Sequence, residues 1–347
     1  MTRGAVRPLM GVVAAMGVLS LALGSVAGPT PLVSFVGVAE ASGEGAQVPA
    51  RPGAYVPPRT PDGQPDIQGM WLPGGLGLPM ERASGGEKPP AADEYAEAGR
   101  GGAGRAGGAP ETGGGGRGGG AGQKPTMVVD PADGKVPLQP WAVARRAEII
   151  ANQDKIEFLD PRVRCLPPGI PRVNLPITFN TYQIQQIPGH VVFVYEWSHH
   201  YRVIPLDGRP HIDPKIRLWM GDPRGRWEGN TLVVDSTNFT DRTWALGHGA
   251  PPVGVPASAL TGGQGVFHSE ALHVVERFTP VDANTIAYEV TIEDPKVFTR
   301  PFKVAWNAFL RAPKEHQLYE YACFEGDTDT VLRMTGFDID PTINVGR

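Results

Sequence analysis

The densest group of side chains able to do chemistry lies within residues 190–209, in the stretch HVVFVYEWSHHYRVIPLDGR. This stretch holds a carboxylate, two imidazoles and a guanidinium: Glu196, His199, His200 and Arg202. General acid–base catalysis needs an imidazole or carboxylate near the substrate and a cation or hydrogen-bond donor where charge develops. Such a set could move a proton beside a carbonyl, as a lyase, isomerase or cyclase requires. The stretch therefore predicts an acid–base site that works without a cofactor.

The predicted catalytic residues come from two segments. Glu196, His200 and Arg202 would share one face of a strand, and His268 and Glu270 would approach from another strand. The competing interpretation is a ladder of ion pairs on an outer sheet face, where such pairs contribute little to stability. A serine-type hydrolase is disfavoured because the chain has no G-x-S-x-G turn.

The same stretch predicts one long strand over residues 191–204, because β-branched and aromatic residues lie there between two turns. Strand side chains alternate between faces, so one face would be aromatic and the other would pass from aliphatic to ionisable. We expect one of these faces to line a ligand cavity, although aromatic residues in strands more often pack in a core. The predicted ligand-binding residues are Tyr195, Trp197, His199, Tyr201 and, from a later segment, Trp219.

A metal site is the first alternative to consider for the histidines. Half of the eight histidines fall in two segments, as His199, His200, His268 and His273, and Glu196, Glu270 or Glu276 could complete a ligand set. Adjacent residues on a strand point to opposite faces, and the odd spacing of His268 and His273 separates them in the same way. We therefore assign no metal ligands and no cofactor, and keep a metal-dependent enzyme as an alternative.

Composition limits the class of partner. The 347 residues include 46 glycines and 36 prolines, so part of the chain cannot belong to a uniformly packed domain. The net charge of −4 and the absence of runs of like charge give no electrostatic footprint for nucleic acid. We expect a small-molecule ligand and no nucleic-acid partner.

The first residues predict export. Arg3 and Arg7 precede an apolar run over residues 9–26, and small residues suited to cleavage follow near residues 27 and 41. We predict a signal peptide over residues 1–41, a periplasmic or secreted protein and no membrane association after cleavage. A single membrane anchor is the alternative, since the run is about long enough to span a bilayer.

The two cysteines, Cys165 and Cys323, predict a disulfide in an oxidising compartment. The alternative is a pair of buried or reactive thiols, although no C-x-x-C motif supports a redox role.

Beyond the signal, three segments are predicted. Residues 42–98 form an N-terminal extension with a first strand near 66–71, and residues 99–125 form a Gly-rich flexible insertion. Residues 126–347 form a domain with a helix and a β-barrel. The helix begins at Pro140, and Val143, Ala147 and Ile150 would face the body of the domain. The proline-dense residues 160–175 predict an extended, rigid loop.

The rest of the chain repeats short strands separated by turns. We predict strands over residues 178–187, 191–204, 216–220, 226–228, 231–239, 270–279, 285–293, 302–311 and 316–325, with a turn at 221–225 and a long loop at 247–265. Nearly all would pair with sequence neighbours, which favours a mainly β fold: an antiparallel up-and-down, lipocalin-like barrel, or else a sandwich, with one short N-terminal helix. Barrels of about eight to ten strands can hold a small ligand.

Five longer motifs stand out along the chain. They are T-P-D-G-x-P-D-x-x-G-x-W at residues 60–71, R-C-L-P-P-G-x-P-R at 164–172, Y-E-W-x-H-x-Y-R at 195–202, G-D-x-R-G-R-W-E-G-x-T-L-V-V-D at 221–235 and H-S-x-A-L-H-V-V-E-R-F at 268–278. In these motifs the chain resembles a family of exported bacterial proteins with a lipocalin-like β-barrel. The resemblance implies a barrel-like β fold for most of the chain beyond the signal, and it implies no substrate.

The sequence thus favours an exported β-barrel that binds a small, partly apolar or aromatic molecule and acts on it as a lyase, isomerase or cyclase. A non-catalytic envelope module that grips a glycan or partner through tryptophans is the second hypothesis. A metal-dependent enzyme is the third.

Overall fold

The computed structural model describes residues 55–75, 79–82, 126–152, 155–176, 181–247, 264–321 and 323. All of them belong to one unit, which spans Arg51–Arg347. The predicted export signal with its cleavage sites, the Gly-rich insertion at 99–125 and residues 248–263 of the long loop lie outside the described residues. Within the described ranges, no helix is long and apolar enough to cross a bilayer.

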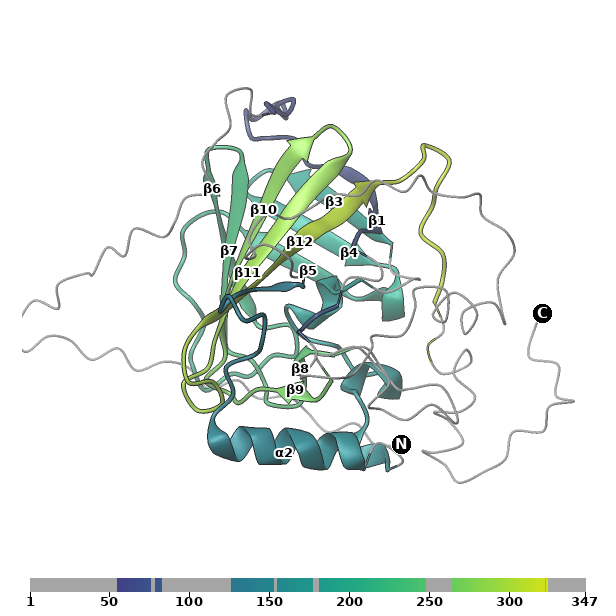
Figure 1. Cartoon of the computed structure of the whole chain (residues 1–347). Coiled ribbons are helices and arrows are strands. Elements are labelled where there is room, and N and C mark those ends of the chain that lie inside the picture. The colour runs from purple at the N-terminus through teal and green to yellow at the C-terminus, as the bar shows by residue number, and fades with distance from the viewer. Residues whose placement is uncertain are drawn as a thin grey trace, which may run out of the picture. The chain divides into compact units, whose positions relative to one another are not determined.

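Short strands bounded by turns form one ten-stranded sheet (Figure 1). Its strands are β1 (Gly69–Pro73), β2 (Val128–Asp130), β3 (Tyr182–Ile187), β4 (His190–Tyr195), β5 (Tyr201–Pro205), β6 (Asp222–Glu228), β7 (Thr231–Thr237), β10 (His273–Asp282), β11 (Thr285–Glu293) and β12 (Phe302–Arg311). The order is β5-β4-β3-β1-β12-β11-β10-β7-β6, with β2 paired to β12. Followed as a ring, this order places each strand but β2 beside its neighbours in the chain, as in an up-and-down barrel. The predicted mainly β, barrel-like fold is confirmed.

The ring is interrupted at one place, between β5 and β6, where no backbone ladder joins the two strands in the described residues. Gly225 of β6 nevertheless lies against β5, because a Cβ atom there would come within 2.6 Å of Leu206 and 2.7 Å of Ile204. Pro223 in β6 is typical of a strand with a free edge, since proline cannot donate to a ladder. We call this line of contact between β5 and β6 the seam. Side chains close the barrel there.

Aromatic side chains fill the middle of the barrel. Alternate residues of β11 are buried: Ile286, Tyr288, Val290 and Ile292. The ring of Phe278 lies 5.0 Å from the rings of both Phe193 and Tyr288, centroid to centroid. Burial of this apolar surface is the main stabilising term of the domain.

The predicted single strand over residues 191–204 is wrong. The structure has β4, then a 3₁₀ turn η4 (Trp197–His199), then β5, which pairs antiparallel with β4. His199 adopts a left-handed φ of 53°, and the Tyr195 amide donates to the His200 carbonyl at 2.8 Å. The reversal changes which side chains point inward. Phe193, Tyr195, Arg202 and Ile204 are buried, whereas Tyr201 is 70% exposed.

Three other predicted elements differ. Residues 216–220 form a loop with one isolated bridge, Leu218 to Phe239, and the Asn238 side chain donates to the carbonyls of Asp213 and Ile216 beside it. Residues 222–225, predicted as a turn, belong to β6. Residues 316–321 do not form a strand. A small second sheet, β8 (Trp244–Leu246) with β9 (Val266–Phe267), was not predicted.

The helix α2 (Pro140–Ala151) begins at the predicted proline, but it is rotated from the predicted orientation. Ala142 and Ile149 are its buried residues, and Val143 is 54% exposed. The Trp141 indole donates to the Lys296 carbonyl, and the Arg146 guanidinium donates to the Gln264 carbonyl. These two polar contacts fix a rotation that apolar spacing alone did not predict.

The proline-dense segment is more structured than predicted. It contains the 3₁₀ turns η2 (Pro161–Arg164) and η3 (Arg172–Asn174), preceded by η1 (Ile156–Phe158). The predicted disulfide between Cys165 and Cys323 is confirmed, and it ties this segment to a residue 158 positions later in the chain. We call residues 160–175 the proline-rich loop.

Candidate functional site

A group of polar side chains lies inside the otherwise apolar barrel, next to the proline-rich loop. At its centre Arg202 of β5 and Glu276 of β10 form an ion pair, Nη2 to Oε2 at 2.5 Å, with both side chains at most 2% exposed. The Tyr288 hydroxyl and the Asn174 amide donate to Glu276 Oε1 at 2.9 and 3.1 Å. Arg202 also donates to the Ser236 hydroxyl at 2.7 Å. With the nearby Tyr195, we call these residues the interior cluster.

Several polar atoms of the interior cluster have no hydrogen-bond partner. They are the Tyr195 hydroxyl, Nε and Nη1 of Arg202, Oδ1 of Asn174, and Oε2 of Glu276, which contacts Arg202 as an ion pair without hydrogen-bond geometry. The Arg202 guanidinium lies beside the Tyr195 hydroxyl and favours its ionised form, yet the two groups do not meet hydrogen-bond geometry. An unpartnered buried polar atom costs about 1–3 kcal/mol. The cluster is therefore short of partners that a bound molecule could supply.

Burial sets the ionisation of the cluster. It raises the pKa of Tyr195 and of Tyr288, so both phenols stay protonated and can donate. Burial is the largest single influence on Arg202 and would lower its pKa, but the Glu276 carboxylate together with the Tyr195 and Tyr288 phenols raises that pKa above the ordinary value. The cluster thus presents a fixed cation, two phenols and a carboxylate, which are the parts that acid–base chemistry uses.

A second polar group lies at η2 and η4. The Arg162 guanidinium stacks over the Trp197 ring at 4.7 Å, and the Trp197 ring lies 5.5 Å from the His200 ring. Arg172 pairs with Asp160 at 2.5 Å, and both side chains are buried. His200 is partly buried, its Nε2 has no partner, and burial followed by the charge of Arg162 lowers its pKa. We call these residues the loop-arginine cluster.

The structure separates the predicted catalytic residues. Arg202 lies in the interior cluster and His200 in the loop-arginine cluster. Glu196 accepts from the Thr181 amide at 3.1 Å, and Glu270 lies near the surface, 3.3 Å from Arg217. His268 is buried outside both clusters.

His268 is held on both ring nitrogens. It bonds to the Thr243 hydroxyl at 2.6 Å and to the Ser269 carbonyl at 3.0 Å, and burial lowers its pKa. A neutral imidazole with two protein partners is a structural arrangement, so His268 is not brought to either cluster.

The predicted ligand-binding residues are also divided. Tyr195 faces the interior cluster and Trp197 stacks with Arg162. His199 is exposed and its Nε2 accepts from the Tyr321 amide at 3.3 Å. Tyr201 points outward, and Trp219 is partly exposed in the loop between β5 and β6.

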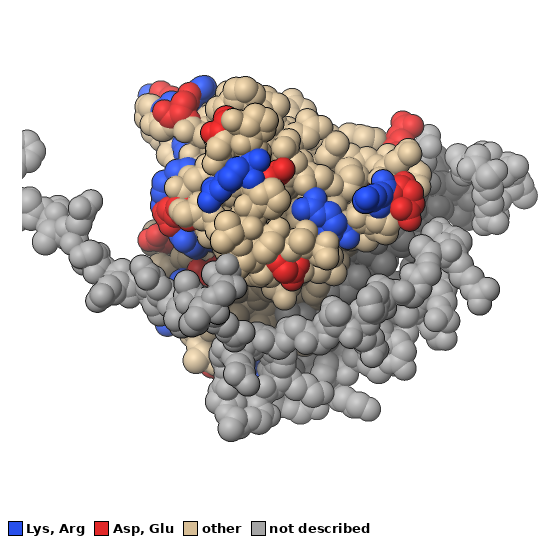
Figure 2. All heavy atoms as spheres, turned by 90° about the horizontal axis from the view of Figure 1, so that it is seen from above, with Lys and Arg blue, Asp and Glu red and all other residues tan. Residues whose placement is uncertain are grey.

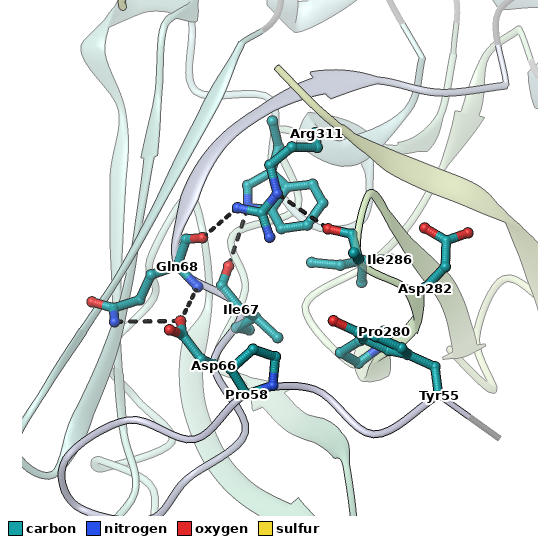
Figure 3. A pocket seen from close by; sticks show the side chains of 11 residues that line it. Tyr55, Pro58, Asp66, Ile67, Gln68, Pro280, Asp282, Ile286 and Arg311 are labelled. Carbon is teal, nitrogen blue, oxygen red and sulfur yellow. Dashed lines mark hydrogen bonds between the residues drawn. The ribbon is translucent and has the colours of Figure 1, made fainter. Parts of the chain in front are cut away.

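A pocket of about 290 Å³ lies elsewhere, beside the turn between β10 and β11 (Figure 3). Arg311 lies over the Trp71 ring at 3.9 Å and donates to the carbonyls of Gln68 and Ala283. Asp66 accepts from the Gln68 amide at 2.9 Å. These polar groups already have protein partners, so this pocket anchors the N-terminal segment and offers a ligand less than the interior cluster does.

The outer face carries a chain of alternating carboxylates and imidazoles. His211 lies between Asp222 and Asp235 at 2.9 and 3.2 Å, and His273 contacts Asp235 at 3.1 Å and Glu293 at 3.6 Å. We call these five residues the outer histidine chain. In the part of the chain that the structure describes, no three His, Cys, Asp or Glu side chains are arranged to hold a metal ion.

Seen from above, the described surface carries positive and negative side chains mixed together (Figure 2).

Sequence reasoning missed most of the two clusters. The sequence offers Glu276 only as a possible metal ligand, places Asn174 and Arg162 in a loop, and gives no functional signal for Tyr288. One signal was available: Glu276 occupies an inward position in the alternation of residues 273–278, where an unpaired charge is costly.

Comparison with family models, with curated proteins and with solved structures finds no match.

Proposed function

We propose that the protein binds a small, partly apolar or aromatic molecule at the interior cluster and moves a proton on it without a cofactor. The observation that supports this is the set of buried, unpartnered atoms on Tyr195, Arg202 and Asn174. Native proteins pair nearly all buried polar atoms, so such a concentration is typical of a site completed by a bound molecule.

The chemistry of the cluster suits a carbonyl compound. Arg202 Nη1 and the Tyr195 hydroxyl would donate to the carbonyl oxygen, where negative charge develops when a neighbouring proton is removed. Glu276 is the carboxylate beside them and would take that proton. The rings of Phe193 and Phe278 lie next to the cluster and would pack against an apolar or aromatic body.

The test is proton exchange in heavy water. The purified protein is incubated with a panel of small cyclic and aromatic ketones, and deuterium incorporation beside the carbonyl is followed by mass spectrometry. We expect at least one ketone to exchange, and Glu276→Gln to slow that exchange by about 100-fold or more. Glu270→Gln removes a carboxylate near the surface and should change nothing. Exchange that is equal in both variants, or absent with every ketone, contradicts the proposed chemistry.

Binding is tested separately from catalysis with a matched pair of tyrosines. Tyr195→Phe removes a hydroxyl that has no partner, so the free protein should keep its melting temperature while the exchanging ketone binds about tenfold more weakly. Tyr288→Phe removes a hydroxyl bonded to Glu276, so it should destabilise the fold. Undiminished ketone affinity in Tyr195→Phe would remove Tyr195 from the site.

A further inference from the structure

The loop-arginine cluster contains more buried positive charge than negative charge. Arg162 and Arg172 are both at most 6% exposed, and the carboxylate that faces them is Asp160. Asp160 pairs with the Arg172 side chain at 2.5 Å and accepts from the Arg162 backbone amide at 2.9 Å. Among the described residues, no carboxylate forms an ion pair with the Arg162 guanidinium.

The unpartnered atoms of this cluster, and of Arg164 beside Asp160, are all nitrogens. Nη1 of Arg162, Nη1 of Arg172, Nε of Arg164 and Nε2 of His200 are buried without a hydrogen-bond partner. The charged groups among these can only donate, so the partner they lack is an acceptor that carries negative charge. The face of Trp197 holds the Arg162 guanidinium in place while its Nη1 remains unbonded.

We propose that the loop-arginine cluster is an anion site that takes a small monocarboxylate, bound through Arg162 and Arg172 beside His200. A planar carboxylate matches the fork of a guanidinium and has one charge to desolvate, whereas phosphate carries more charge into a buried setting. His200 and Arg164 are partly exposed, which places the open side of the site beside them. The inference goes beyond the interior cluster, since it holds whether or not that cluster binds a ligand.

The lowered pKa values of Arg162 and His200 are those expected of a site that lacks a bound anion. Burial, followed by repulsion from Arg172, lowers the pKa of Arg162 to about 9. The phenols of Tyr182 and Tyr321 and the Asp160 carboxylate act in the opposite direction and do not restore the ordinary value. A bound carboxylate would restore the ordinary pKa of Arg162. It would also offset the charge of Arg162 that lowers the pKa of His200.

The experiment uses benzoate, with the neutral benzamide as its matched probe and inorganic phosphate as a different anion. Benzoate should raise the melting temperature and bind by calorimetry, and benzamide should do neither. Arg162→Met keeps a side chain on Trp197 but removes the charge. It should abolish the benzoate effect and raise the melting temperature of the free protein by about 2–4 °C. Arg300→Met, which alters an exposed arginine, should leave benzoate binding unchanged.

A second readout keeps the proposal testable if Arg162→Met folds poorly. Benzoate should raise the pKa of His200 in the unaltered protein, measured by NMR titration. Equal effects of benzoate and benzamide, stabilisation by phosphate alone, or a His200 titration that benzoate does not shift would each overturn the carboxylate assignment. Loss of ketone exchange at the interior cluster leaves these outcomes unaffected, so the two proposals fail independently.

Discussion

At the scale of single residues, the two clusters differ in which of their buried groups lack a partner. The interior cluster pairs its charges, Arg202 with Glu276, and leaves both donor and acceptor atoms without hydrogen bonds. The loop-arginine cluster leaves a charge unpaired. A buried pair contributes little net stability, but breaking it leaves a lone charge in an apolar setting. The ion pair therefore has a structural role in addition to the role proposed for it in ligand binding.

A double-mutant cycle separates those roles. Arg202→Met leaves the Glu276 carboxylate without its cation and should lower the free energy of unfolding by about 3–5 kcal/mol. The double variant Arg202→Met/Glu276→Gln should recover most of that loss, because the glutamine oxygen still accepts from Tyr288 and Asn174. Urea unfolding measures both values. A double variant as unstable as the single one would show that the charge pair is not the source of the loss.

At the scale of elements, sequence patterns predicted strands far better than they predicted the sites. The predicted strands 285–293 and 302–311 match β11 and β12 residue for residue, because each strand and its turns follow local alternation. The turn at Trp197–His199 depends on Glu196 accepting from Thr181 and on a left-handed His199, which no local pattern shows. Once that turn was missed, the inward direction of Arg202 could not be derived. The clusters also join strands to the proline-rich loop, and such long-range contacts leave no spacing signal.

The stability that the outer histidine chain contributes to the fold depends on pH. The bond to Asp235, more than any other contact, raises the pKa of His273 above its ordinary 6.5. A raised pKa means that protonated His273 stabilises the fold; this stability is complete below pH 6.5 and is lost as the pH rises through the folded pKa. His273→Gln should therefore cost more stability at pH 5.5 than at pH 8.5. The difference should be below about 1 kcal/mol, because the side chain is partly exposed.

Thermal unfolding at both pH values measures this effect, with His190→Gln as the control. His190 lies on β4 and its imidazole bonds only to the Pro188 carbonyl among the described contacts. It forms no ion pair among the described residues, so its replacement measures the loss of an imidazole without a carboxylate partner at each pH. A His273→Gln loss that is independent of pH would show that the bond to Asp235 does not depend on protonation.

At the scale of the whole molecule, one covalent link spans most of the barrel. The Cys165–Cys323 disulfide has a sequence separation of 158 residues and encloses every strand from β3 to β12. In the chain-entropy model, a loop of this length contributes about 5 kcal/mol by restricting the unfolded chain. The same link holds the proline-rich loop, and with it Arg162, Arg172 and Asn174, against the barrel.

Replacing both cysteines by serine should lower the free energy of unfolding by up to about 5 kcal/mol and weaken benzoate binding. Urea unfolding and calorimetry measure the two effects, and mass spectrometry of alkylated, unreduced protein should find no free thiol. Two alkylated cysteines in the unaltered protein would contradict the link. An unchanged urea midpoint would show that the unfolded chain is already restricted.

The seam has a consequence for motion. Opening most of the wall breaks rows of backbone hydrogen bonds, whereas the described residues of β5 and β6 share no such row. The two strands meet there through side-chain contacts, such as that of Gly225 with Ile204, and through the bonds of Arg202 across to β7 and β10. Local opening should thus be cheapest there, and the facing amides of the two strands should exchange with solvent first. Arg202 lies on β5 and reaches inward to β7 and β10. The seam therefore runs beside Arg202, the central residue of the interior cluster. A small molecule could reach Arg202 through the seam without breaking backbone hydrogen bonds of the sheet.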